Sequence, residues 1–209
     1  MISSLLAGVA RVIAGGTVVW TEALTDTRQR IFFGNHTSHL DFILIWSSLP
    51  VRLRRRARPV AASDYWEAGP IRRYLAHKVF NAVLIERGGR EQGGGQSPAV
   101  RGREAVARMV AGLGREDSLI LFPEGTRGSG ERVAEFKSGL YYLCRERPDV
   151  DLIPVHLANL NRVLPKGEVI PVPAISRVAF GAPMRLEEGE AKDAFLERAR
   201  RAVEQLGAA

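Results

Sequence analysis

The sequence has few of the residues from which disulfides and zinc sites are built. Among its 209 residues there is a single cysteine, Cys144, so neither an intrachain disulfide nor a cysteine-based zinc site can form. We expect Cys144 to be a small buried apolar residue. Four histidines are present, and only His36 and His39 are close together in the sequence. They show no metal-ligand spacing, so no metal is predicted.

A long uninterrupted apolar run is also missing. The most apolar stretch, residues 1–20, carries Arg11 near its middle and is broken by glycines. A spanning helix needs about 20 predominantly apolar residues, and a central arginine costs about 2.5–3.5 kcal/mol on insertion scales, so a full crossing is not expected. We predict instead an apolar helix over residues 1–24 that lies in the membrane interface with Arg11 reaching the headgroups. Taken alone, this stretch fits an ordinary core helix equally well.

Positive charge is in excess, and the excess is local. The chain has 30 Lys and Arg against 23 Asp and Glu, a formal net charge of +7, and a pI near 10.2. Residues 51–90 contain ten basic and three acidic residues, which accounts for the whole excess. Such a balance points to an anionic partner, either nucleic acid or lipid. The arginine-rich segment 52–58 is predicted to be a surface patch that faces anionic headgroups or an acidic carrier protein.

Short apolar runs alternate with amphipathic segments along the chain. Runs of strand length occur at residues 31–33, 60–62, 82–85, 119–122, 152–157 and 178–180. Segments 98–113 and 192–206 place apolar residues at helical spacing on one face. This alternation and the length predict one α/β domain over residues 25–209, with a mostly parallel central sheet flanked by helices.

A histidine and an aspartate lie where the run at 31–33 gives way to a predicted helix. Ser38 and Asp41 match the capping-box pattern, which predicts a helix that begins at Ser38. The functional alternative is that His36 is a general base whose ring is oriented by the carboxylate of Asp41.

A second polar turn follows the run at 119–122. Glu124, Thr126 and Arg127 supply an acceptor, a hydroxyl and a guanidinium, and Gly125 lets a ligand approach the backbone. Arginine can bind a phosphate with two parallel hydrogen bonds. An ordinary surface turn would explain the same residues.

Two further cations follow predicted strands or turns. Arg87 ends the run at 82–85, and Lys137 opens the next helical segment, where its amine could contribute to an anion site. Ligands collect outside the carboxyl ends of parallel strands, so we expect Arg87 and the turn at Glu124 to share one sheet edge with His36. A base beside an arginine-lined anion pocket suggests acyl transfer to a hydroxyl of a phosphorylated acceptor.

Four ordered motifs carry a family resemblance: NHTSHLD (residues 35–41), LIER (84–87), FPEGTR (122–127) and IPV (153–155). Together they resemble the glycerolipid acyltransferases of the lysophosphatidic acid (1-acylglycerol-3-phosphate) acyltransferase type. The resemblance implies that His36 deprotonates the acceptor hydroxyl for attack on an acyl thioester, assisted by Asp41.

The resemblance also implies roles for the remaining residues. Acceptor-phosphate binding is implied for Arg87 and the turn Gly125, Thr126 and Arg127, with Glu124 positioning the glycerol. The implied donor is acyl-CoA or acyl carrier protein, with no metal and no bound cofactor. No serine nucleophile is needed, which agrees with the absence of a Gly-x-Ser-x-Gly elbow from the sequence.

The second motif departs from the family pattern. Asn81 and Leu84 stand where the family usually has glycine and phenylalanine, which leaves the chemistry intact and puts the acceptor's identity in doubt. Alternatives are another lysolipid acceptor, or a basic nucleic-acid- or lipid-binding module without catalysis. We expect a lysophospholipid acceptor, an acyl thioester donor, no nucleic-acid partner, and association with an anionic membrane at its cytoplasmic face.

Overall fold

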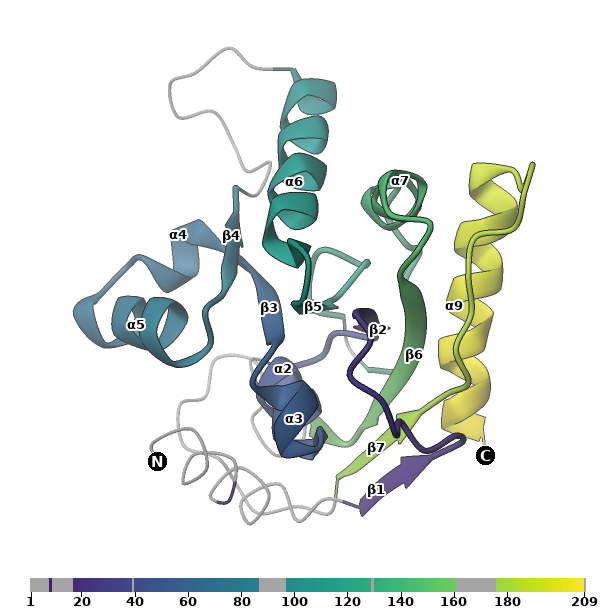
Figure 1. The fold of residues 1–209 in the computed structure, drawn as a ribbon, viewed down its shortest axis with the longest axis horizontal. Helices are drawn as coiled ribbons and strands as arrows, with labels where there is room; N and C mark the ends of the chain where they lie inside the picture. The colour runs from purple at the N-terminus through teal and green to yellow at the C-terminus, as the bar shows by residue number, and fades with distance from the viewer. Residues whose placement is uncertain are drawn as a thin grey trace.

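The computed structural model describes Gly8 and residues 17–38, 40–86, 97–128, 130–160 and 176–208. Within these residues, seven strands form a sheet in the order β1-β7-β6-β2-β5-β3-β4 (Figure 1). Neighbouring strands run parallel, except that β6 and β7 are antiparallel. The predicted mostly parallel sheet is therefore confirmed. The strands are β1 (Thr17–Trp20), β2 (Arg30–Gly34), β3 (Ala57–Ala62), β4 (Val83–Ile85), β5 (Ser118–Leu121), β6 (Asp151–Ala158) and β7 (Arg177–Phe180).

Helices cover both faces of the sheet. They are α2 (Asp41–Ser48), α3 (Val51–Arg54), α4 (Ser63–Trp66), α5 (Pro70–Tyr74), the π-helix η1 (Leu75–Val79), α6 (Pro98–Leu113), α7 (Gly139–Glu146) and α9 (Lys192–Ala208). One apolar core lies between the sheet and α2, and a second lies under α6, α7 and α9, which form a row (Figure 1). The helices expected over 98–113 and 192–206 are confirmed.

β2 lies in the interior of the sheet, and its side chains reach both cores. All of Arg30–Gly34 is buried. Phe32 belongs to the core under α2, whereas Ile31 and Phe33 belong to the core under α6, α7 and α9. A strand that is buried on both faces typically has a continuous run of apolar residues in its sequence.

The predicted N-terminal helix over residues 1–24 is wrong at its carboxyl end. Residues 17–20 form β1, which pairs with β7, and Trp20 stacks on Phe180 with ring centroids 3.8 Å apart. Val18 and Trp20 alternate with more exposed neighbours, a period of two that suits an edge strand. Residues 1–16, apart from Gly8, lie outside the described residues. In the part of the chain that is described, no helix has the length and apolar character needed to span a bilayer.

The predicted arginine patch at 52–58 is wrong for two of its five arginines, Arg54 and Arg58. Arg54 is buried, and its guanidinium lies over the Trp46 ring, 5.4 Å from the centroid. Arg58 donates to the carbonyls of Asn81 and Gly112 at 2.7 and 2.8 Å.

The remaining arginines of this segment lie far from the predicted site. Arg56 pairs with Glu116 at 3.2 Å, so Arg52 and Arg55 are the exposed arginines of the segment without such a contact among the described residues. Both precede β3, whose first residue pairs with the first residue of β5. They therefore lie at the amino-terminal edge of the sheet, opposite the edge at which His36 follows β2.

Candidate active site

The end of β2 is held tightly against β6. A Cβ at Gly34 would lie 2.5 Å from the carbonyl oxygen of Val155, so glycine is required for this approach. Asn35 then extends the pairing: its amide donates to the Leu157 carbonyl at 2.9 Å and accepts from the Leu157 N–H at 2.8 Å. These contacts fix His36 at the carboxyl edge of the sheet. Asn35 was not among the predicted site residues, although it opens the first motif.

His36 and Asp41 form a pair. His36 Nδ1 lies 2.7 Å from Asp41 Oδ2, and the same oxygen accepts the N–H groups of Thr37 and Ser38 at 2.6 and 2.9 Å. The Asp41 side chain is fully buried, whereas that of His36 is 15% exposed. With Nδ1 held by the carboxylate, Nε2 is the ring nitrogen that can take a proton from a ligand.

The capping-box and catalytic interpretations of Asp41 turn out to be compatible. The carboxylate accepts the Ser38 N–H, as a capping box requires, and also holds the His36 ring. Helix α2 begins at Asp41, however, and not at Ser38 as predicted. The N–H groups of Thr37 and Ser38 instead both point to the Asp41 carboxylate.

Glu124 supports His36 from the neighbouring strand. β5 pairs directly with β2, so the turn that follows β5 lies beside His36. Glu124 Oε1 accepts the His36 N–H at 2.8 Å, and Oε2 accepts the Ala134 N–H at 3.2 Å. The His36 carbonyl in turn accepts the Gly128 N–H at 2.8 Å. Glu124 thus positions the histidine and the loop, and the residue is only 4% exposed.

Burial raises the pKa of Glu124 above its ordinary value of 4.5. The folded protein therefore holds the Glu124 proton at pH values where the unfolded chain has released it, and this contribution to stability declines as the pH rises from about 4.5. Glu124→Gln lacks this titration, so its free energy of unfolding relative to wild type is expected to increase over the same range.

Urea unfolding of both proteins between about pH 4 and 7 measures this difference. Glu188→Gln changes an exposed glutamate and is the matched control. A difference between Glu124→Gln and wild type that stays constant with pH would contradict the prediction.

A largely apolar cavity of about 320 Å³ opens beside His36. Its walls come from α2, β3, α4, β4, α6, β5, the turn after β5, and α7. They include Val60, Trp66, Ile85, Met109, Phe122 and Leu140. The Phe122 ring stacks on the His36 ring with centroids 4.4 Å apart. His36 therefore stands at a cavity that suits an aliphatic chain.

Among the described residues, Lys137 is the lysine or arginine that lines this cavity. Its side chain crosses Gly125, where a Cβ would lie 2.7 Å from Lys137 Nζ, and Gly125 has a positive φ of 71°. Glycine therefore makes room for the lysine as well as for the turn. The Lys137 N–H donates to the Pro123 carbonyl at 2.9 Å, which joins the two segments.

The predicted site residues separate into three groups. His36, Gly125 and Lys137 line the cavity, and Asp41 and Glu124 hold His36 from behind. Thr126 is exposed and Arg127 is half-buried, and neither lines the cavity. Arg87 lies outside the described residues. Within the described ranges, no group of three or more histidine, cysteine or acidic side chains is arranged to hold a metal ion.

Comparisons with known proteins identify the family and a similar fold. A family model described as Acyltransferase matches residues 17–158, from the start of β1 to the end of β6. The fold is similar to the crystal structure of the 1-acyl-sn-glycerophosphate (LPA) acyltransferase PlsC from Thermotoga maritima, with a TM-score of 0.68 and 22% sequence identity. That match covers 100% of this chain and 79% of the other. No curated protein sequence matches significantly.

Proposed function

Because the chain belongs to the Acyltransferase family, we propose that it transfers a fatty acyl group from an acyl thioester to the free hydroxyl of lysophosphatidic acid, forming phosphatidic acid. The observation that carries this proposal is the His36–Asp41 pair, which presents one free ring nitrogen to an apolar cavity. The similarity to an LPA acyltransferase of known structure supports the choice of acceptor.

The proposed reaction is direct transfer. His36 Nε2 removes the proton from the acceptor hydroxyl while its oxygen forms a bond to the thioester carbonyl carbon. The resulting imidazolium is stabilised by the buried carboxylate of Asp41, 2.7 Å from Nδ1. When the tetrahedral intermediate collapses, the carbon–sulfur bond breaks and the thiolate takes the proton from His36. The proton that His36 takes from the hydroxyl ends on the leaving thiol, so the reaction needs no covalent enzyme intermediate.

Two features of the cavity support a lipid acceptor with a phosphate. The apolar walls can bury an acyl chain, and each buried methylene contributes about 0.8 kcal/mol. Lys137 supplies a positive charge at the same opening as His36, and it can bind a phosphate as a point charge. The proposed donor is acyl-CoA or acyl carrier protein, used as a co-substrate, and the scheme needs no bound metal or cofactor.

An assay of the purified protein with lysophosphatidic acid and acyl-CoA tests the function. Phosphatidic acid is the expected product, and lysophosphatidylcholine in a parallel assay separates this acceptor from other lysolipids. Transfer to lysophosphatidylcholine but not to lysophosphatidic acid would show that the acceptor is another lysolipid. No transfer to either acceptor, with acyl-CoA or acylated carrier protein as donor, would favour a lipid-binding module without catalysis.

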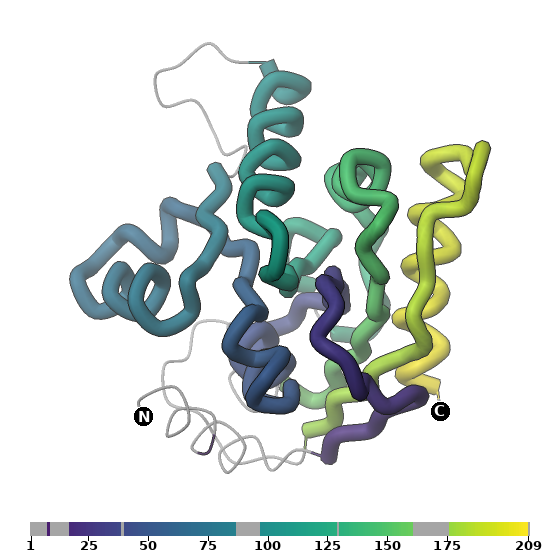
Figure 2. Tube along the Cα trace, in the orientation of Figure 1, coloured from purple at the N-terminus to yellow at the C-terminus, as the bar shows by residue number. Residues whose placement is uncertain are grey.

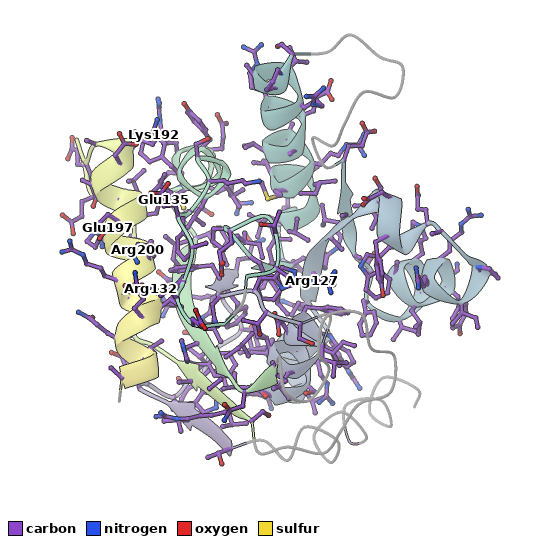
Figure 3. The ribbon with its side chains drawn as sticks, turned by 180° about the vertical axis from the view of Figure 1, so that it is seen from behind. Arg127, Arg132, Glu135, Lys192, Glu197 and Arg200 are labelled. Atoms are coloured by element: carbon purple, nitrogen blue, oxygen red, sulfur yellow. The ribbon has the colours of Figure 1, made fainter. Side chains whose placement is uncertain are left out.

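Replacing Lys137 by alanine is expected to raise KM for lysophosphatidic acid about tenfold, with a smaller change in kcat, because one charge-assisted phosphate contact is lost. Initial rates at varied acceptor concentration measure the effect. Lys192→Ala on α9 is the matched control, since Lys192 lies well apart from Arg127 and the site (Figure 3). Because Arg127 does not line the cavity, Arg127→Ala is expected to raise KM less than Lys137→Ala. Equal KM values for Lys137→Ala and wild type would remove Lys137 from the phosphate site.

We also propose that the protein acts at the cytoplasmic face of an anionic membrane, where a lysophospholipid acceptor resides. The local excess of positive charge in residues 51–90 supports this location. Since Arg54, Arg56 and Arg58 are used within the fold, the cations that face lipid must be others.

A further inference from the structure

Helix α5 carries the most exposed apolar side chains of the described surface. Ile71 is 74% exposed and Tyr74 is 52% exposed, and no other large apolar side chain among the described residues exceeds 50%. They lie three residues apart, so they share one face of the helix. Every residue from Pro70 to Tyr74 is exposed, and the segment projects from the body of the domain (Figure 2). Exposed apolar residues grouped in this way mark an interaction surface.

The same segment is basic. Arg72, Arg73, His77 and Lys78 are exposed, and no acidic residue occurs between Pro70 and Val79. The nearest acids in sequence, Asp64 and Glu67, belong to α4 and the turn after it. Apolar side chains flanked by arginine and lysine are the composition of a helix that lies in a lipid interface.

The inner side of this segment anchors it to the cavity wall. Leu75 and Val79 pack against the core under α2, and Ala76 is buried. The Arg72 guanidinium lies 4.3 Å from the centroid of the Tyr65 ring, and Tyr65 and the adjacent Trp66 line the cavity. A surface that contacts α5 is therefore separated from the substrate cavity by a single side chain, that of Tyr65.

We propose that the outer face of α5 and η1, comprising Ile71, Arg73, Tyr74, His77 and Lys78, docks on an anionic lipid bilayer. Ile71 and Tyr74 enter the interface while Arg73 and Lys78 lie at the level of the headgroup phosphates. Docking places the wall formed by Tyr65 and Trp66 beside the lipid from which an acceptor enters. The inference rests on the proposed lipid acceptor, and it identifies which surface of the protein meets the membrane.

Site-specific labelling tests the contact directly. Cys144 is buried and its burial raises the pKa of the thiol to about 12, so a thiol-reactive probe will modify an introduced cysteine selectively in the folded protein. The full chain with Ile71→Cys, carrying an environment-sensitive fluorophore, is mixed with vesicles of phosphatidylcholine and phosphatidylglycerol. Arg52→Cys, an exposed arginine of α3 outside the α5 and η1 face, is the matched control.

We expect the probe at position 71 to shift to the blue and to become protected from a water-soluble quencher, and the probe at position 52 to stay unchanged. Vesicle flotation with continued quenching at position 71 would overturn the proposal, because another segment would then make the contact. Failure to bind the vesicles would overturn it as well.

Charge reversal gives an independent measure. Arg73→Glu/Lys78→Glu is expected to weaken binding to the anionic vesicles by at least about tenfold, whereas Arg52→Glu/Arg55→Glu should weaken it less. A larger loss of binding for Arg52→Glu/Arg55→Glu than for Arg73→Glu/Lys78→Glu would assign docking to the amino-terminal edge of the sheet.

Acyl transfer to a short-chain, water-soluble acceptor separates this proposal from the proposed function. The α5 variants should retain this transfer, since they alter only the docking face. Protection at position 71 in a protein without any transfer would refute the function and leave the docking surface intact.

Discussion

Replacing His36 by alanine is expected to lower kcat for acyl transfer by about 10²–10⁴-fold, the usual contribution of a positioned general base. The reason is local: with Nδ1 held by Asp41, Nε2 is the nitrogen that His36 offers to the cavity. The loss should fall on kcat, because the imidazole acts on the proton that moves in the transition state. The apolar walls and Lys137 remain, so KM should change little.

Two further measurements separate catalysis from folding in the His36→Ala variant. The backbone N–H of residue 36 still donates to Glu124, so we expect the thermal unfolding midpoint to stay close to that of wild type. Added imidazole can enter the space left by the ring beside Phe122 and should restore part of the rate. A variant with wild-type turnover would exclude His36 as the base, whatever its other properties.

The second large effect is expected for Asp41→Asn, which should reduce kcat by up to about 10⁴-fold. In the wild-type protein, one oxygen of the Asp41 carboxylate accepts the Thr37 and Ser38 N–H groups and holds His36 Nδ1. An asparagine oxygen can accept the same N–H groups, but the amide is neutral and cannot stabilise an imidazolium equally. Its NH₂ group would also have to occupy the buried position of Oδ1, which has no hydrogen-bond partner among the described residues.

Asp193→Asn provides a matched control for the change of charge at a helix start. Asp193 lies in the first turn of α9, as Asp41 does in α2, but its side chain is 91% exposed. Both substitutions remove a favourable charge from a helix N-terminus, an effect of about 0.3–1 kcal/mol on stability. Only Asp41→Asn should lose turnover. Equal kcat values for the two variants would show that Asp41 serves only to begin the helix.

The strands and long helices could be predicted because their signals are local. The runs at 31–33 and 119–122 and the segment 98–113 carry their periodicity within a few residues, and the structure confirms each as β2, β5 and α6. β1 escaped prediction because its four residues continue an apolar stretch that also fits a helix. Their strand conformation depends on pairing with β7, which lies about 160 residues later in the chain.

Among the candidate site residues, distance along the chain decided what could be predicted. The His36–Asp41 pair spans five residues, so the sequence alone indicated both members and their contact. The hydrogen bond between Glu124 and the His36 N–H spans 88 residues, and only the pairing of β5 with β2 creates it. Lys137 reaches the cavity for a similar reason, since its path over Gly125 depends on how the turn folds back.

By itself, the sequence determined the α/β class, the histidine–aspartate pair, and the excess of positive charge. The tertiary structure decided how that charge is used: Arg54 and Arg58 are committed to Trp46 and to backbone carbonyls, while exposed cations beside Ile71 remain on α5. Charge and hydropathy are properties of single residues, so composition reports them. Whether a cation meets a protein carbonyl or a lipid phosphate depends on which distant segments fold against it, and only the packed structure contains that information.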